Sequence, residues 1–189
     1  MAETALAITK KLGDIKTLFN KIDEVYFFKT PNQLPSAVKT ADFECPVGSD
    51  GVTFNTGDPS ITRYKLTTGE TWTSLSTAGD CDISFAIASV DGEVNDTFLN
   101  KETADAVELG ATVDGKSYSG SGYNLEPKKV VGGLLMCSED KQVVIYLPTV
   151  EMYSSLHVED GKPMYHQIAC TPLASTADGA TIYFLKAGA

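Results

Sequence analysis

The pattern of apolar and polar residues predicts a protein built mainly of β-strands. The clearest pair lies at residues 130–137 and 143–147, two apolar runs joined by a polar tetrapeptide at 138–141, which is the composition of a hairpin. The second run is continuous rather than alternating, so both of its faces should be covered. Pro148 has no N–H to donate, and we expect it to end that ladder before a further extended run at 150–158.

Alternation of apolar with polar or small residues predicts most of the other strands. Residues 61–66 and 71–75 flank a turn and form a second hairpin, in which Trp72 is expected on the packed face. Residues 83–88 alternate large apolar with small side chains, which is typical of a strand with one closely packed face. Further strands are predicted at residues 25–28, 112–118, 122–125, 163–173 and 181–186.

Two segments have the periodicity of helices. Residues 95–109 are the stronger candidate, with Asn95 or Asp96 as the N-cap and Gly110 after the last turn. Apolar residues spaced three or four apart at 12–22 predict a short helix near the N-terminus.

These elements predict one main domain at residues 40–189, an antiparallel β-sandwich or barrel that carries one packed helix. An N-terminal segment at residues 1–39 precedes it, with the short helix and one strand. Residues 40–60 are rich in Gly, Asp, Asn and Pro and are predicted to form a long flap.

Composition narrows the class of protein. No apolar run approaches the roughly 20 residues that cross a bilayer, and the N-terminus lacks the apolar core of a secretory signal, so we expect synthesis in the cytoplasm and no membrane contact. The cysteines are far apart and form no C-x-x-C pair, which favours their interpretation as small buried hydrophobes rather than disulfides or zinc ligands. They are Cys45, Cys81, Cys137 and Cys170.

The net charge of −10 argues against a protein that holds nucleic acid by neutralising phosphates. It is compatible with a surface past which nucleic acid slides. The charge is also uneven, since residues 76–115 hold nine acidic residues against one lysine, whereas residues 1–40 hold six lysines against four acidic residues. This asymmetry indicates either a solvated face or the two halves of a head-to-tail contact between identical subunits.

No catalytic or cofactor motif is present, so we expect neither enzymatic activity nor a cofactor. His157 and His166 flank the loop 160–162 and admit a metal or Cys–His site, but a structural role is favoured. Residues 91–96 place oxygen ligands at alternate positions, as in a calcium site, but they lack the EF-hand spacing. A solvated or lumen-facing acidic surface is the favoured interpretation, and no metal site is predicted.

Three tyrosines, Tyr123, Tyr153 and Tyr165, are candidates for a ligand platform, although aromatic residues in strands more often belong to a core or a subunit interface.

The order of these elements resembles the tail tube proteins of long-tailed bacteriophages and the related tube subunits of contractile injection systems. Residues 143–152, a strand, a proline and a second strand, resemble a segment near the C-terminus of many such proteins. Residues 64–75 are similar to the long hairpin of the family, 83–88 to its next core strand and 95–109 to its single helix. The resemblance covers residues 40–186 and leaves the helix predicted at 12–22 unplaced.

The resemblance implies a virion structural protein, made in the host cytoplasm, whose hexameric rings stack into a tail tube and contact other tail proteins. DNA would pass through the tube without specific binding. The flap at 40–60 and the N-terminal segment are expected to join one ring to the next. An alternative is a monomeric β-sandwich binding module, such as a virion decoration, baseplate or carbohydrate-binding domain.

Two sets of candidate site residues follow from these interpretations. The acidic set is expected to face the lumen or a neighbouring subunit, and it comprises Asp80, Asp82, Asp91, Glu93 and Asp96. Gly132 and Gly133 are expected where the sheet curves around a ring or where backbones approach closely.

Overall fold

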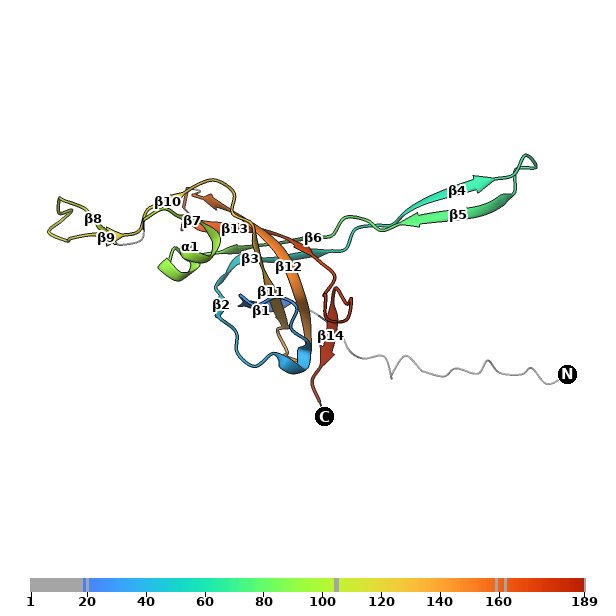
Figure 1. The fold of residues 1–189 in the computed structure, drawn as a ribbon, viewed down its shortest axis with the longest axis horizontal. Coiled ribbons are helices and arrows are strands. Elements are labelled where there is room, and N and C mark those ends of the chain that lie inside the picture. Colours follow the sequence, from blue (N-terminus) through green and yellow to red (C-terminus); the bar gives the residue numbers. More distant parts are fainter. Residues whose placement is uncertain (1–18, 20, 104–105, 159, 162, 189) are drawn as a thin grey trace.

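The computed structural model describes residues 19, 21–103, 106–158, 160–161 and 163–188. In this part of the chain a nearly closed antiparallel barrel carries one α-helix, which confirms the predicted fold class. Two hairpin arms extend from opposite sides of the barrel (Figure 1). The main sheet contains β1 (Ile22–Phe28), β2 (Phe43–Cys45), β3 (Val47–Asn55), β6 (Asp82–Ile87), β11 (Val130–Ser138), β12 (Val143–His157), β13 (Tyr165–Pro172) and β14 (Tyr183–Lys186).

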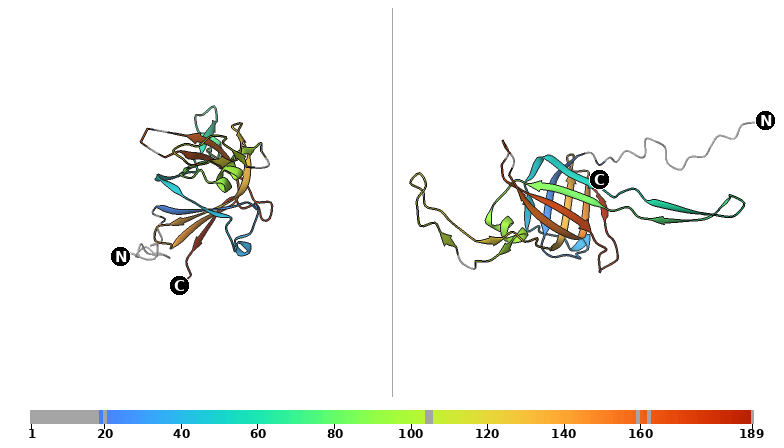
Figure 2. Two further views of the ribbon diagram at one scale, coloured as in Figure 1. Left: turned by 90° about the vertical axis from the view of Figure 1, so that its left-hand side faces the viewer. Right: turned by 90° about the horizontal axis from the view of Figure 1, so that it is seen from above.

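The strands of the main sheet lie in the order β2-β1-β11-β12-β13-β6-β3, and β14 adds to the first half of β12. β2 and β3 are the two edges of this order, yet only Pro46 separates them in the chain. One segment therefore supplies both edges, which curls the sheet into a barrel (Figure 2). Proline suits this corner because it donates no ladder bond, and its carbonyl accepts the N–H of Ala88 at 3.0 Å.

β12 is one strand of 15 residues, and the expectation that Pro148 ends it is wrong. Its first half pairs with β14 as far as Tyr146, and its second half pairs with β13 from Val150 onward. Pro148 lies in the gap between these partners. On the opposite edge of β12, the ladder with β11 shifts register between Gly132 and Leu134. A residue without an N–H is tolerated at such an irregularity, because no ladder bond is lost there.

The loop after β1 covers the outer face of β12. Tyr146 is fully buried, and its hydroxyl donates to the carbonyl of Gln33 at 3.1 Å. Asn32 donates its N–H to the carbonyl of Pro148 at 2.8 Å and accepts the hydroxyl of Thr149 at 2.8 Å. The prediction that both faces of this run are covered is confirmed, but the chain's own loop provides the cover. No neighbouring subunit is required for it.

The core lies inside the barrel and is closed at one end by α1 (Gly92–Phe98) (Figure 2). Phe98 is buried, with its ring 5.9 Å from Phe27 and 6.4 Å from Phe43. The fully buried aliphatic side chains alternate along the barrel strands. They are Val25, Ile83, Ile87, Leu134, Met136, Leu147, Val150, Met152 and Ile168.

Several predicted boundaries differ from the structure. The helix begins at Gly92 rather than at 95 and ends at Phe98, because Asp91 is the N-cap and accepts the N–H of Glu93 at 2.9 Å. Beyond it lie β7 (Asn100–Lys101), β8 (Val107–Glu108), β9 (Ser119–Gly120) and β10 (Tyr123–Asn124). The strand predicted at 112–118 is reduced to one bridge between Val113 and Lys116.

The N-terminal part also needs correction. Residues 40–60 are not a flap, since they contain β2, β3 and the start of β4 (Ser60–Lys65), and β1 is an interior strand of the barrel. A short 3-10 helix occupies Pro35–Ala37. The helix predicted at 12–22 lies mostly outside the described residues, and Ile22 begins β1. Among the described helices, none is long and apolar enough to cross a membrane.

Candidate assembly surface

The first candidate surface is arm 1, residues 56–81, a hairpin of β4 and β5 (Thr71–Thr77) that continues from β3 and β6. Every residue of β4 and β5 is exposed. The tip is closed by bonds from the Leu66 N–H to the Glu70 carbonyl and from the Gly69 N–H to the Leu66 carbonyl. The arm stands away from the barrel (Figure 1), so the barrel core does not hold its side chains.

The two faces of arm 1 differ in character. Tyr64 pairs with Thr73, and Leu75 pairs with Thr62, so Tyr64 and Leu75 share one face of the hairpin. Their exposed fractions are 50% and 58%. Arg63 alternates with Tyr64 and points to the other face. Arm 1 thus presents Tyr64 and Leu75 together on one face, whereas the other face carries Arg63 and one large apolar side chain, Ile61, which is 52% exposed.

Trp72 was expected to pack within this hairpin, and that prediction is wrong. The ladder shifts register between Tyr64 and Lys65, so Trp72 is the extra residue on β5. Its side chain is 73% exposed. A two-stranded ribbon has no second layer beneath it, so neither face of the hairpin can bury an indole within one copy.

The root of arm 1 is a close crossing of two backbones. Gly57 and Gly79 face each other between the last pair of β3 with β6 and the first pair of β4 with β5. A Cβ on Gly57 would lie 2.4 Å from the Asp80 carbonyl oxygen, and one on Gly79 would lie 2.6 Å from that of Asp58. Gly57 also has φ of 70°. Only glycines permit this approach.

The second candidate surface is arm 2, defined by the described residues 102–103 and 106–127, which carries β8 and β9. Val107 pairs with Gly120, and the N–H of Leu109 donates to the carbonyl of Tyr118, so these four residues share one face. Val107, Leu109 and Tyr118 are 56%, 54% and 48% exposed. They line a shallow groove of about 400 Å³.

The root of arm 2 is fastened to α1 by polar contacts. Asp96 accepts the hydroxyl of Tyr123 at 2.6 Å and the ammonium of Lys101 at 3.0 Å. The Tyr123 hydrogen bond and then Lys101 lower the pKa of Asp96. Lys128 donates to the carbonyls of Asp96 and Leu99 at 2.7 and 2.9 Å, and burial lowers its pKa. Lys128 therefore satisfies carbonyls at the C-terminal end of α1.

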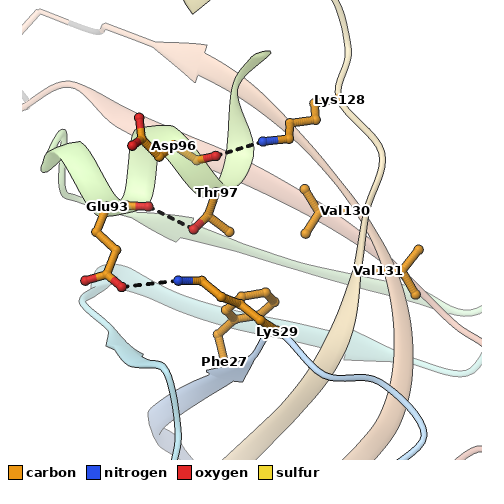
Figure 3. Close-up of a pocket in the computed structure, with 8 residues that line it drawn as sticks. All are labelled: Phe27, Lys29, Glu93, Asp96, Thr97, Lys128, Val130 and Val131. Carbon is orange, nitrogen blue, oxygen red and sulfur yellow. Dashed lines mark hydrogen bonds and ion pairs between the residues drawn. The ribbon is translucent and has the colours of Figure 1, made fainter. Parts of the chain in front are cut away.

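A groove of about 500 Å³ lies between α1 and β11 (Figure 3). Lys29 reaches across it to Glu93 at 3.3 Å, and the Thr97 hydroxyl donates to the carbonyl of Glu93 at 2.8 Å. Phe27 and Val130 form its apolar side. Of the charged groups drawn in Figure 3, Lys29 binds Glu93 and Lys128 binds the Asp96 carbonyl, while the Asp96 carboxylate binds Tyr123 and Lys101 at the root of arm 2. The groove therefore serves as the junction between helix and barrel.

A further hollow, of about 420 Å³, lies on the outer face of β3, β6 and β13. Small side chains line it along β6, namely Ser84 and Ala86, and Ala88 continues this lining beyond the strand. This follows from the predicted alternation of large and small residues. Tyr165 and Gln167 from β13 complete one side.

The structure divides the five predicted acidic residues into two groups. Asp80 and Asp82 lie at the root of arm 1 and the start of β6, whereas the other three lie on or beside α1, beyond the other end of β6. Those three have local partners: Asp91 caps the helix, Glu93 contacts Lys29 and Asp96 contacts Lys101. The predicted set is therefore not one continuous surface.

The two predicted glycines lie at the irregular part of β11. A Cβ on Gly132 would be 2.4 Å from the Phe28 carbonyl oxygen and 2.7 Å from the Phe27 ring. A Cβ on Gly133 would have its closest contact at 3.4 Å, with the Leu147 carbonyl oxygen. Close backbone approach thus occurs at Gly132.

The two histidines lie in different surroundings. His166 is buried between the Ser154 hydroxyl, at 2.8 Å from Nδ1, and the Asn95 amide oxygen, at 2.9 Å from Nε2. Asn95 belongs to α1, so His166 fastens the helix to β13. His157 is exposed and stacks on Tyr165 with ring centroids 5.5 Å apart. His166 therefore has a structural role.

Burial of three cysteines confirms their predicted role as small hydrophobes. Cys45, Cys137 and Cys170 are buried, Cys81 is half-buried, and all four are free thiols. Burial raises the pKa of Cys45 to about 12. Among the described residues, no group of three or more His, Cys, Asp or Glu side chains is placed to hold a metal ion.

The other predicted tyrosines also have local contacts. The Tyr153 hydroxyl donates to Glu151 at 2.8 Å, and Tyr123 belongs to the root of arm 2.

The apolar face of arm 2 was not predicted from the sequence. Val107, Leu109 and Tyr118 come onto one face only once β8 and β9 are paired. The only indication of this face in the sequence is that the three apolar residues are spaced within a polar, glycine-rich segment.

Comparison with models of known protein families gives no match to this chain, and comparison with curated protein sequences also gives none.

Proposed function

We propose that this protein is a virion structural subunit that self-assembles into stacked rings forming the tail tube of a long-tailed bacteriophage. The observation that carries the proposal is the exposure of large apolar side chains on two arms that leave opposite sides of the barrel. Large apolar side chains that are exposed together on one surface are typical of sites of protein–protein contact. Two such sites per copy allow a chain of contacts to continue.

The charge of the chain supports a conduit for DNA. A net charge of −10 repels phosphates, so a tube lined by this protein would let DNA pass without adhering. The flap expected at 40–60 does not exist, because residues 43–55 form barrel strands, so the contacts between copies are assigned to the arms.

Negative-stain electron microscopy of the purified full chain at high protein concentration tests the proposal. Rings or hollow tubes are the expected result, across a range of salt concentrations. A protein that stays strictly monomeric in every salt condition would contradict it and would favour a monomeric binding module that uses the hollow beside Tyr165.

A further inference from the structure

We propose that arm 1 of one copy binds arm 2 of the next copy, apolar face against apolar face, so that copies join head to tail. Arm 1 contributes Tyr64 and Leu75, and arm 2 contributes Val107, Leu109 and Tyr118. This inference rests on the self-assembly in the proposed function and names the two surfaces that carry it.

The shapes of the two faces are suited to each other. The apolar face of arm 2 is hollowed into a groove of about 400 Å³, and Gly120 leaves open space on that face because nothing lies within 4 Å of its Cβ position. The face of arm 1 instead carries projecting side chains, with Tyr64 half exposed and Leu75 more so. Projecting side chains that enter a hollow exclude water from both surfaces.

The charges of the arms favour contact between unlike arms. Between their first and last strand residues, arm 1 (60–77) holds Arg63 and Lys65 against Glu70, whereas arm 2 (107–120) holds Glu108 and Asp114 against Lys116. The roots of both arms are acidic, with Asp58 and Asp80 in arm 1 and Glu102 and Glu126 in arm 2, so the difference in charge lies in the paired strands and their turns. Two copies of arm 2 would repel each other, and opposite charge steers arm 1 toward arm 2.

The placement of the arms determines what such a contact can build. They leave opposite sides of the barrel (Figure 1), so a contact between unlike arms always leaves one arm free at each end. Contacts of this heterologous kind close into rings or extend into filaments, whereas a contact between two identical arms ends as a dimer.

Two double variants test the proposal by complementation. One carries Tyr64→Ser and Leu75→Ser on arm 1, and the other carries Leu109→Ser and Tyr118→Ser on arm 2. All four side chains are exposed in one copy, so the thermal midpoint of the monomer should not change. Circular dichroism and thermal unfolding verify this before assembly is measured.

Size-exclusion chromatography with light scattering then gives the mass of each variant at a concentration at which the unmodified protein assembles. Each variant alone should be monomeric. An equimolar mixture should give one species of twice the monomer mass, because one intact arm 1 meets one intact arm 2. Ile61→Ser, a comparable change on the other face of arm 1, should assemble like the unmodified chain.

Three results would overturn the arm-to-arm contact while leaving the proposed function intact: an arm 1 variant that still assembles, a variant that dimerises with itself, or a mixture that stays monomeric. An unmodified chain that never assembles would overturn the proposed function and the contact together.

Discussion

The fold leaves no room for a side chain at Gly132. Replacing it with Ala would place a Cβ 2.4 Å from the Phe28 carbonyl oxygen, so β1 or β11 would have to move. We expect Gly132→Ala to lower the free energy of unfolding by about 2–3 kcal/mol, as other overpacking changes do. Urea unfolding of the monomer measures this.

Gly133→Ala is the matched control, because the nearest atom to its Cβ position is at 3.4 Å. Its effect should stay below about 1 kcal/mol, since a tolerated Ala also restricts the unfolded chain. Equal effects of the two substitutions would show that the close approach at Gly132 is absent in solution.

His166 should make stability depend on pH. Burial lowers its pKa from the ordinary value of 6.5, so the folded state takes up a proton at lower pH than the unfolded state. As the pH falls below about 6.5, the unfolded chain binds a proton that the folded chain does not, and stability is lost. The contribution of His166 to stability should therefore be full well above pH 6.5 and should be lost progressively as the pH falls through and below this value.

Urea unfolding at about pH 7.5, 6.5 and 5.5 measures this decline, and His166→Gln should flatten it. His157→Gln, which replaces an exposed histidine, should keep it. This window lies above the range in which Asp and Glu side chains are protonated, so carboxylates contribute little to the slope. An unchanged slope in His166→Gln would exclude His166 as its cause.

Sequence reasoning at the level of single residues succeeded where the local pattern decides the outcome. The buried cysteines and the covered run around Tyr146 follow from composition and continuity of apolar residues. Pro148 was misjudged because its position between two partner strands depends on pairing with segments far away in the chain. Trp72 was misjudged because alternation is the same whether a face packs internally or stands in solvent.

At the scale of elements, α1 depends on contacts from outside itself. It has seven residues, too few to be stable alone, so Lys128 and His166 hold it in place. Lys128→Met would leave the carbonyls of Asp96 and Leu99 without their charged donor. We expect a loss of about 1–2 kcal/mol in the free energy of unfolding, measured by urea titration.

The neighbouring lysine supplies the control for this prediction. Lys129 forms an exposed ion pair with Glu151, and water screens such pairs, so Lys129→Met should have the smaller effect. The reverse order of the two variants would contradict the capping role of Lys128.

Strands were easier to predict than the helix. β6 alternates large apolar with small residues and β11 is a continuous apolar run, and the predicted ranges of both, and of β13, match the structure closely. The helix was displaced because residues 99–109 also carry apolar residues at helical spacing, although they continue into arm 2. Lys128 binds the carbonyls of Asp96 and Leu99 at the end of α1. The sequence near the helix does not predict these contacts, because Lys128 lies far along the chain.

At the scale of the whole molecule, the barrel and arm 1 should give separate spectroscopic signals. Trp72 is the single tryptophan, and it is 73% exposed on arm 1. Unfolding the monomer in urea should therefore shift its fluorescence little, because the indole is in water before and after. A large red shift on unfolding would show that arm 1 folds back onto the barrel.

The candidate surface was the least predictable part of the molecule. The sequence predicts the hairpin of arm 1 but not its exposure. The local pattern does not indicate whether other elements pack against a two-stranded hairpin. The acidic residues from Asp80 to Asp96 are close in sequence, but β6 separates them into two groups in space.

Because arm 1 leaves the barrel at the crossing of Gly57 and Gly79, a small change of angle at this crossing would move the tip of the arm a long way. Because a strand rises about 3.3 Å per residue, the tip of the arm lies about 30 Å beyond this crossing, and a rotation of about 10° there displaces the tip by about 5 Å. A displacement of that size exceeds the distance between neighbouring strands of a sheet. Two residues without side chains, remote from the tip, thus set where the apolar face that we propose binds a neighbouring copy lies relative to the barrel.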